Sequence, residues 1–312
     1  MKIAIIGAGG IAQKAYFPLL CCWPEIVING VFSRTQKTID HVSREWGFTN
    51  GTTDITHILE NKPDAVIVLS STSSHFEFCR LFLENGVDVY SEKSLTPTSK
   101  EAFELSRIAD ENQRILAVGF NRRYALLYRQ AKEIFGSRRI QFALFQKHRT
   151  SQGDKTIADL YLDDIIHQID LARFFCGDLE ATSTSYSIAN NMIAGVVSQM
   201  QISGGGQCVI AASKLSGAWQ ESATLHGEGL TVHVDAFARL KVSYPDHDEV
   251  YGSDRPGKWI RDMRERGFQG ELEHFFECIK TRQKPQTNAL EAGKTLELME
   301  NLVKVSKKTQ KT

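Results

Sequence analysis

Apolar and polar positions along the first 120 residues follow a repeating order of short apolar runs and longer helical patterns. The apolar runs predicted as strands are 2–6, 28–32, 65–69, 87–91 and 115–119, and the helical patterns are 10–20, 36–46, 55–60, 74–84 and 99–111. Run 65–69 is apolar at every position, which is typical of a strand covered on both faces and favours parallel strands joined by helices. We therefore expect an α/β domain of the doubly wound type over residues 1–120.

The pattern changes after Phe120, where shorter β-type runs replace the strand–helix repeat. A helical pattern at 124–135 leads to a β-type run at 140–147 and a second helical pattern at 163–175. Six more β-type runs follow, at 183–188, 195–202, 207–213, 222–226, 230–234 and 240–244, with glycine-rich turns at 204–206 and 227–229. This order predicts a second domain over residues 121–312, of α+β type, built on a mostly antiparallel sheet.

The C-terminal part of the chain completes the second domain. Residues 245–267 are polar and rich in turn signals, which indicates a long loop. Two helices follow. The second, at about 289–306, begins at the capping pair Asn288 and Glu291 and is expected to pack back on the first domain. The basic residues 304–312 are expected to fray.

Charge and composition narrow the classes of partner. Of the 312 residues, 37 are Lys or Arg and 37 are Asp or Glu, so the formal net charge is zero. A chain without net charge has no overall attraction to nucleic acid or to an anionic membrane, and neither is expected as a partner. No apolar stretch reaches the roughly 18 residues that a membrane-spanning helix needs. The N-terminal segment lacks a clear signal-peptide cleavage site.

The six cysteines are scattered along the chain, at positions 21, 22, 79, 176, 208 and 278. None forms a Cys-x-x-Cys pair, and no group of Cys and His has the spacing of zinc ligands, so we expect no metal site. Single thiols of this kind are typical of buried cysteines in a reducing compartment, and we expect a cytoplasmic location.

The residues GAGGIA that follow the first predicted strand fit the pattern G-x-G-x-x-A. Gly7 permits the tight turn, Gly9 lets backbone N–H groups approach a pyrophosphate, and Ala12 lets helix and strand pack closely. The start of the helix offers unpaired N–H donors and a favourable dipole for the anion. The alternative is a structural turn that binds nothing. The place of the turn at the head of the strand–helix series favours a dinucleotide site that includes Gly10 and Ile11.

The end of the second predicted strand indicates which dinucleotide is bound. A carboxylate there binds the ribose 2′-hydroxyl of NAD, whereas a cation favours the 2′-phosphate of NADP. The residues here are Ser33 and Arg34, without an acid. Ser33 can donate to a phosphate and Arg34 can form a bidentate pair with it. We expect NADP as the cofactor, with NAD as the alternative; the other interpretation of Arg34 is an exposed loop residue.

Two clusters contain candidate chemistry. Lys93 follows the fourth predicted strand, at the edge where ligands of parallel sheets bind, and is either a surface cation or a functional group. His75 faces the same edge and is a candidate cofactor contact, while Ser74 beside it is expected to be an ordinary helix cap. Asp163 and His167 are four residues apart on a predicted helix and therefore share a face. The carboxylate can orient the imidazole; the alternative is a structural cap.

Four segments together resemble the glucose–fructose oxidoreductase/inositol dehydrogenase family, known as Gfo/Idh/MocA. They are GAGGIA near the N-terminus, SEKS at 91–94, GFNRRY at 119–124 and DDIIHQID at 163–170, so the resemblance covers almost the whole chain. It implies an N-terminal Rossmann domain, a C-terminal domain on a large open sheet, and homodimers or homotetramers packed through that sheet. It also implies an NAD(P)-dependent enzyme that transfers a hydride at a hydroxyl or keto carbon of a sugar, cyclitol or related polyol.

The resemblance also implies roles for individual residues. Lys93 matches the lysine of the family's Glu-Lys-Pro motif, and Asp163 and His167 match its D-x-x-x-H pair. His167 would accept the proton of the reacting hydroxyl, Lys93 would bind and polarise the oxygen, and Asp163 would stabilise the charged partners. An imidazole suits proton transfer near neutral pH, and an ammonium suits a developing alkoxide.

Further residues are expected near the ligands. Ser71 and Glu92 lie at the ends of two predicted strands and are expected cofactor contacts. Arg122 lies at the domain junction, where it can reach the cofactor or an anionic substrate. Lys147 and Arg149, at a strand end, are either ligands of a substrate carboxylate or phosphate or ordinary solvated residues.

The chain departs from the family pattern at three positions. Ser94 replaces the proline of Glu-Lys-Pro, Ser71 replaces a proline common after the third strand, and Ile165 stands where many members have glycine. These departures motivate a second hypothesis, a dinucleotide-binding sensor or partner subunit without catalysis. A reductase of non-sugar substrates on the same scaffold is a third, because fold does not fix substrate.

Overall fold

The computed structural model describes residues 1–252 and 262–309. The chain divides into two compact units, each formed by two stretches of sequence. The first unit comprises Met1–Phe120 and Phe268–Gly293, and the second comprises Asn121–Gly267 and Lys294–Thr312. Residues 253–261, within the expected loop 245–267, and residues 310–312 of the basic tail lie outside the described residues.

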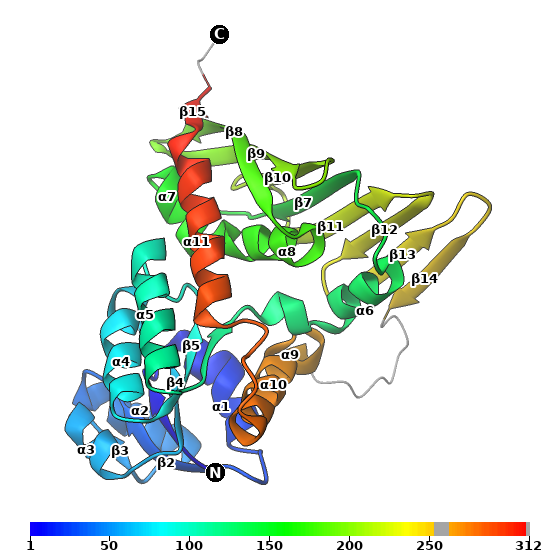
Figure 1. The fold of residues 1–312 in the computed structure, drawn as a ribbon. Coiled ribbons are helices and arrows are strands. Elements are labelled where there is room, and N and C mark those ends of the chain that lie inside the picture. The colour runs from blue at the N-terminus through cyan, green and yellow to red at the C-terminus, as the bar shows by residue number, and fades with distance from the viewer. Residues whose placement is uncertain (253–261, 310–312) are drawn as a thin grey trace. The chain divides into compact units, whose positions relative to one another are not determined.

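The first unit is built on a six-stranded parallel sheet with the order β3-β2-β1-β4-β5-β6. Its strands are β1 (Lys2–Ile6), β2 (Val27–Phe32), β3 (Gly51–Thr52), β4 (Ala65–Val68), β5 (Asp88–Glu92) and β6 (Leu116–Gly119). Its helices are the π-helix η1 (Ala12–Tyr16), α1 (Phe17–Leu20), α2 (Gln36–Trp46), α3 (Ile55–Glu60), α4 (Thr72–Glu84), α5 (Ser99–Glu111) and α10 (Phe268–Thr281). Helices lie on both faces of the sheet, with α4 and α5 on one face and α1 and α10 on the other (Figure 1). The predicted doubly wound α/β arrangement is confirmed.

Burial explains why the central runs form strands. Every residue of β4 is fully buried, and the last four residues of β1 are at most 1% exposed. A strand that is covered on both faces needs apolar side chains at every position, which is the pattern that the sequence shows. Because the strands are parallel, their carboxyl ends meet at one edge of the sheet.

The start of α4 differs from the expectation. Ser71 is the N-cap residue and the helix begins at Thr72, so the expectation that Ser74 caps the helix is wrong. The Ser74 hydroxyl instead lies within the first turn, 2.9 Å from the Ser70 hydroxyl and 2.8 Å from the Ser71 carbonyl oxygen. The strand β3 was not expected, because two residues are too few to give a periodic pattern.

The second unit is built on a nine-stranded sheet with the order β14-β13-β12-β11-β7-β10-β9-β8-β15. Its strands are β7 (Phe142–His148), β8 (Leu179–Ala189), β9 (Met192–Ile202), β10 (Gln207–Ser213), β11 (Gln220–Gly227), β12 (Leu230–Asp235), β13 (Arg239–Ser243), β14 (Asp248–Gly252) and β15 (Ser306–Lys308). Neighbouring strands are antiparallel except in the pairs β7–β10 and β8–β15. The predicted, mostly antiparallel sheet is confirmed.

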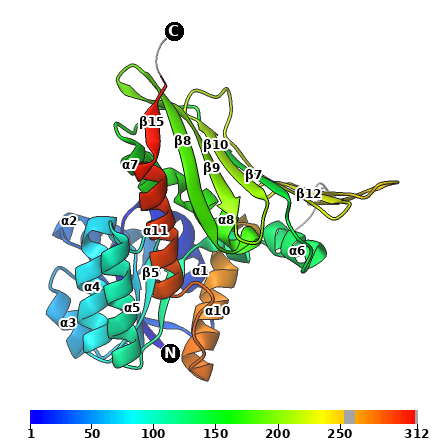
Figure 2. The same ribbon diagram turned by 45° about the horizontal axis from the view of Figure 1, so that its top comes forward.

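Helices cover one face of this sheet. The helices of this unit include the 3-10 helix η2 (Asn121–Tyr124), α6 (Leu126–Phe135), α7 (Ile157–Leu160), the π-helix η3 (Tyr161–Ile165), α8 (Ile166–Cys176) and α9 (Asp262–Glu265); α11 (Ala289–Lys304) begins in the first unit and continues in the second. Helices α6 and α8 pack against the sheet face to which Ala143, Phe145 and Lys147 of β7 point (Figure 2). The opposite face carries no helix from the described ranges.

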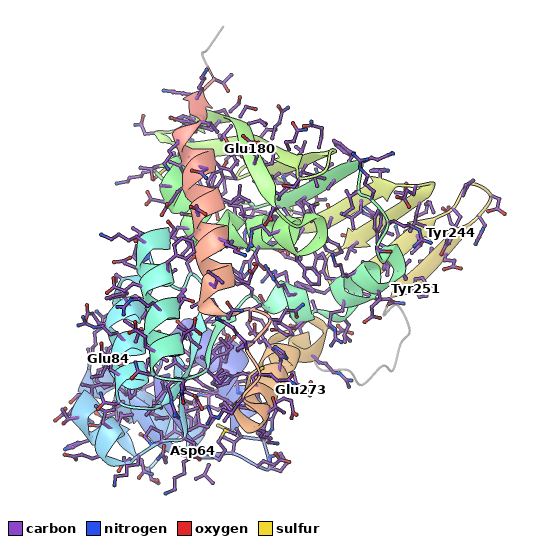
Figure 3. All side chains as sticks on the ribbon, viewed as in Figure 1. Asp64, Glu84, Glu180, Tyr244, Tyr251 and Glu273 are labelled. Atoms are coloured by element: carbon purple, nitrogen blue, oxygen red, sulfur yellow. The ribbon has the colours of Figure 1, made fainter. Side chains whose placement is uncertain are left out.

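Two segments differ from the sequence expectation. The segment 245–267, expected as a loop, contains β14, which pairs with β13, and the short helix α9. Residues 306–308, expected to fray, form β15, which pairs with β8. Both strands pair with the edges of the sheet mainly through backbone hydrogen bonds, so their sequences do not show the apolar pattern that predicts a strand. Tyr244 and Tyr251 lie on the β13–β14 hairpin, at the outer end of the sheet (Figure 3).

No helix within residues 1–252 and 262–309 combines the length and apolar character that crossing a lipid bilayer requires.

Candidate functional site

The first group of candidate residues surrounds a cleft in the first unit. The cleft has a volume of about 370 Å³ and lies where β1, β2 and β4 end. Its lining residues are Gly7, Ala8, Gly9, Gly10, Ile11, Phe32, Ser33, Arg34, Thr35, Thr38, Leu69, Ser70, Ser71, Ser74 and Phe78. The structure thus brings the glycine-rich turn together with Ser33, Arg34 and Ser71, while Ala12 packs beneath the turn, fully buried.

Gly7 and Gly9 lie in different surroundings. Gly7 has a φ of +107°, and a Cβ at this position would lie 2.6 Å from the backbone nitrogen of Ser70, so the neighbouring loop excludes any side chain. At Gly9 a Cβ would meet no described atom within 4 Å, so a side chain would project into open space beside the cleft. The backbone N–H of Gly7 donates to the Phe32 carbonyl oxygen at 2.9 Å, so the N–H groups that a small residue at position 9 leaves open to an anion are those after Gly7.

The charge of the cleft also fits an anion. Arg34 is the charged residue among the lining residues, and none of them is a carboxylate. Thr35 caps α2 by accepting a hydrogen bond from the backbone nitrogen of Thr38, and the two threonine hydroxyls are 2.9 Å apart. The guanidinium and the hydroxyls of Ser33, Thr35 and Thr38 therefore provide donors where β2 ends, which fits a ligand that carries phosphate there. No sequence motif pointed to Thr35, Thr38 or Phe78 as lining residues.

Lys93 leaves the carboxyl end of β5 between two buried neighbours. Glu92 is 7% exposed and Ser94 1%, whereas Lys93 is half-buried. The Glu92 carboxylate accepts a hydrogen bond from the Lys93 backbone nitrogen through Oε2 (2.8 Å) and one from the Tyr16 hydroxyl through Oε1 (2.7 Å). Glu92, expected to contact the cofactor, therefore shapes the backbone around Lys93.

His75 lies beneath the same edge of the sheet. It is 1% exposed, and its two ring nitrogens are each 2.9 Å from a backbone carbonyl oxygen, Nδ1 from that of Ser94 and Nε2 from that of Ser70. Burial lowers the pKa of His75, although the carbonyl groups favour the charged imidazole. His75 does not line the cleft. The structure thus gives it a different role from the expected cofactor contact: it joins the loops that follow β4 and β5.

The second group of candidate residues lies in the second unit, where η3 leads directly into α8. Asp163 belongs to the π-helical turn and is exposed, whereas His167 belongs to α8 and is 7% exposed. The carboxylate of this turn that is buried among cations is that of Asp164. The sequence analysis did not single out Asp164.

Asp164 is the centre of a cluster of charged side chains. Its carboxylate lies 2.9 Å from Lys147 Nζ, 2.7 Å from Arg149 Nη2 and 3.2 Å from Lys214 Nζ. Burial alone would raise the pKa of Asp164, but hydrogen bonds from Arg149 and the charge of Lys147 hold it well below the usual range. Burial lowers the pKa of Lys147 to about 8. Lys147 is 1% exposed, so the interpretation as a solvated strand end is wrong for this residue.

Arg122 connects His167 to Glu221. Its guanidinium donates two hydrogen bonds to the Glu221 carboxylate, both 2.9 Å, and its Nη1 lies 3.3 Å from Nε2 of His167. Because a guanidinium can only donate, Nε2 of His167 is the acceptor in this contact. Burial would raise the pKa of Glu221, but Arg122 lowers it. Arg122, expected near the cofactor or an anionic substrate, is thus engaged by Glu221, which the sequence analysis also did not single out.

A larger cavity, of about 440 Å³, lies at the opposite edge of the parallel sheet, beside the start of β6. Two of its cations are already paired, Arg282 with Asp88 at 2.8 Å and Lys284 with Asp110 at 3.0 Å. Ligands of doubly wound sheets bind beyond the carboxyl ends of the strands, so the smaller cleft is the candidate site.

Comparisons with known proteins show what the chain is similar to. Residues 1–120 match the family model described as "Oxidoreductase family, NAD-binding Rossmann fold". The Salmonella typhimurium protein YceM is 27% identical over 290 residues, which cover 92% of each chain. The Bacillus subtilis scyllo-inositol 2-dehydrogenase (NAD(+)) is 25% identical over 321 residues, which cover 96% of this chain and 92% of that enzyme. The crystal structure of the dehydrogenase MviM from Clostridium difficile has a TM-score of 0.89 at 25% identity and covers 97% of this chain and 99% of that one.

The fold, the cleft and these similarities define an oxidoreductase with an NAD(P)-binding Rossmann domain. The family model that residues 1–120 match is that of the Gfo/Idh/MocA oxidoreductases, the family that the four sequence motifs resemble.

Proposed function

We propose that the protein transfers a hydride between NADP and a hydroxyl or keto carbon of a cyclitol, sugar or related polyol. The observation that carries the proposal is the half-buried Lys93 at the carboxyl end of β5, on the same sheet edge as the dinucleotide cleft. This edge is where open α/β sheets bind their ligands. The name of the Bacillus subtilis relative, an inositol dehydrogenase, supports the cyclitol class.

The chain's own residues manage the proton and the charge of the reaction, while the nicotinamide, when bound, accepts or supplies the hydride. In the direction of oxidation, His167 accepts the hydroxyl proton; in reduction it returns that proton. The ammonium of Lys93 stabilises the negative charge that develops on the same oxygen. Asp163 stabilises the two cationic partners, and the backbone N–H groups of the turn at 8–11 bind the pyrophosphate.

The preference for NADP rests on Arg34, which lines the cleft where no carboxylate is present among the lining residues. The substitution Arg34→Gln is expected to raise the dissociation constant for NADPH about 10- to 100-fold, because a charge-assisted hydrogen bond contributes about 1.5–3 kcal/mol. The constant for NADH should change little. Fluorescence titration of both reduced cofactors measures this, with Arg44→Gln, an exposed arginine of α2, as the matched control. Tighter binding of NADH than NADPH by the wild-type protein would contradict the assignment.

The substrate class is tested by a panel of cyclitols, aldoses, sugar acids and planar apolar ketones. Each alcohol is incubated with the oxidised cofactor and each ketone with the reduced one, and the absorbance of reduced nicotinamide is followed. We expect turnover with at least one cyclitol or sugar and none with the apolar ketones. Turnover confined to the ketones would overturn the proposed substrate class but leave the redox chemistry intact.

We also propose that copies of the chain associate through the uncovered face of the nine-stranded sheet. Phe142 and Val197 lie on this face and are 39% and 45% exposed, although both are apolar. Light scattering after size-exclusion chromatography is expected to show a dimer or tetramer, and Val197→Glu should shift it toward the monomer. Leu290→Glu, at an exposed apolar residue of α11, is the control. A wild-type monomer would contradict this proposal.

A further inference from the structure

Tyr16 is the centre of a buried hydrogen-bonded cluster in the first unit. It ends the π-helix η1, which follows the glycine-rich turn, and it is fully buried. Its hydroxyl lies 2.7 Å from Oε1 of Glu92, 2.9 Å from the hydroxyl of Tyr90 and 3.2 Å from Oε1 of Glu271. The four residues come from η1, β5 and α10, so the cluster ties three elements together.

Glu92 extends the cluster to Lys93. Oε1 of Glu92 accepts a hydrogen bond from the Tyr16 hydroxyl, and Oε2 accepts one of 2.8 Å from the Lys93 backbone nitrogen. Hydrogen bonds to an ionised carboxylate are short and strong, so a donor on each oxygen fixes the orientation of the group. A continuous path of two hydrogen bonds therefore leads from the helix after the phosphate-binding turn to the backbone of Lys93.

Close packing keeps the Tyr16 hydroxyl in this position. Its ring meets those of Tyr90 and Phe268 edge-on, each at a centroid distance of 5.8 Å. A Cβ at Gly119 would lie 2.7 Å from the Tyr90 hydroxyl and 3.4 Å from the Tyr16 hydroxyl, so the β6 backbone approaches the cluster as closely as a glycine permits. Tyr16 has no room to turn away without displacing these neighbours.

The segment is also held on the other side of Lys93. His75 Nδ1 lies 2.9 Å from the backbone carbonyl oxygen of Ser94, which is 1% exposed. The family motif has a proline here, whose ring restricts the backbone; in this chain the backbone carbonyl group of the serine is held by a side chain from α4. The backbone of Lys93 thus has a buried hydrogen-bonding partner on each side.

We propose that Tyr16 is a positioning residue for Lys93: its hydroxyl orients Glu92, and Glu92 holds the Lys93 backbone at the edge where the ammonium meets the substrate oxygen. The inference rests on the proposed catalytic role of Lys93. Tyr16 itself does not line the dinucleotide cleft. Loss of its hydroxyl therefore acts on turnover rather than on the binding of cofactor or substrate.

The test is Tyr16→Phe, which keeps the ring and removes the hydroxyl. Because small misplacements of a catalytic group cost up to about 100-fold, we expect kcat to fall about 10- to 100-fold. KM and the dissociation constant for NADPH should stay within about threefold of wild type. The control is Tyr128→Phe, because Tyr128 is equally buried and its hydroxyl has no hydrogen-bond partner in the part of the chain that the structure describes. This control should keep wild-type kcat.

A second variant separates positioning from general damage. Glu92→Ala should lower kcat with KM nearly unchanged, and adding Tyr16→Phe to it should lower kcat no further, because both changes break the same path. Additive losses in the double variant would overturn the inference. If circular dichroism shows that Tyr16→Phe does not fold, Glu92→Gln is tested in its place, because glutamine has nearly the same size as glutamate. The same fall in kcat is expected.

The reference experiment is Lys93→Ala. If this variant keeps full turnover, the proposed function itself fails. If Lys93→Ala loses turnover while Tyr16→Phe keeps the wild-type kcat, the proposed function stands and the positioning role is overturned. A rise in the dissociation constant for NADPH without a change in kcat would also overturn it, because Tyr16 would then support only the phosphate-binding turn.

Discussion

Replacing His167 by asparagine is expected to lower kcat about 10²- to 10⁴-fold, which is the usual contribution of a general acid–base group. The dissociation constant for NADPH should stay near the wild-type value, because His167 is not among the residues that line the dinucleotide cleft. Stopped-flow and steady-state rates with the substrate from the panel measure kcat, and fluorescence titration measures binding. The substitution is close in size to the imidazole but cannot take up a proton at neutral pH.

His41→Asn provides the matched control, because His41 is an exposed histidine on α2 that does not line the cleft. It should keep the wild-type kcat. A wild-type kcat in His167→Asn would remove the proposed acid–base role. A raised KM as the only change would show that His167 merely binds the substrate.

Replacing Asp164 by asparagine is expected to lower the free energy of unfolding by about 3–5 kcal/mol, as when one partner of a buried ion pair is removed. Lys147 is 1% exposed and Lys214 is 7% exposed. Their Nζ atoms lie 2.9 Å and 3.2 Å from the Asp164 carboxylate. Asparagine leaves the buried Lys147 ammonium without its ion-pair partner, whereas Lys214 keeps a second one, Asp154, at 3.0 Å. Urea denaturation followed by circular dichroism gives the free energy from the midpoint and slope.

The neighbouring residue provides the control for this prediction. Asp163 precedes Asp164 on the same π-helical turn but is exposed, so Asp163→Asn should change the free energy of unfolding by no more than about 0.5 kcal/mol. In the proposed mechanism Asp163→Asn lowers kcat instead. Equal stability of the two variants would show that Asp164 does not compensate the buried cations.

The ion pairs of Asp164 also make the stability of the protein depend on pH in the acid range. The pKa of Asp164 is lowered in the folded protein by Arg149 and Lys147 against the effect of burial, so the unfolded chain binds the proton more readily. Its stabilisation is therefore complete above the ordinary carboxyl pKa of about 3.9 and is lost as the pH falls below that value. Denaturation midpoints measured from pH 6 down to about pH 3 should fall less steeply for Asp164→Asn than for wild type.

The strands of the first unit were predictable because burial on both faces leaves a plain apolar signal. Residues 65–69 show this best: the structure has β4 at Ala65–Val68, with every residue fully buried. The glycine-rich turn was predictable for a related reason, because the backbone at Gly7 has a geometry and a close neighbour that exclude other residues.

The charged cluster of the second unit was harder to predict, because a charge gives no sign of its partners. Lys147 alternates with Ala143 and Phe145 along β7, and this period of two does place it on the buried face. The carboxylate that pairs with Lys147 could not be predicted in the same way. Asp163 and Asp164 are adjacent and chemically identical, and which of them is buried depends on the π-helical turn η3. Such a turn has no sequence signature.

The central claim is that Lys93 and His167 act on one substrate oxygen, and a double-mutant cycle tests it most directly. The value of kcat/KM is measured for the wild-type protein, Lys93→Ala, His167→Asn and the double variant. Residues that act together on one group are not independent, so the double variant should lose much less than the product of the two single losses. Losses that multiply in full would contradict the account, because each residue would then act on a separate step or a separate part of the substrate.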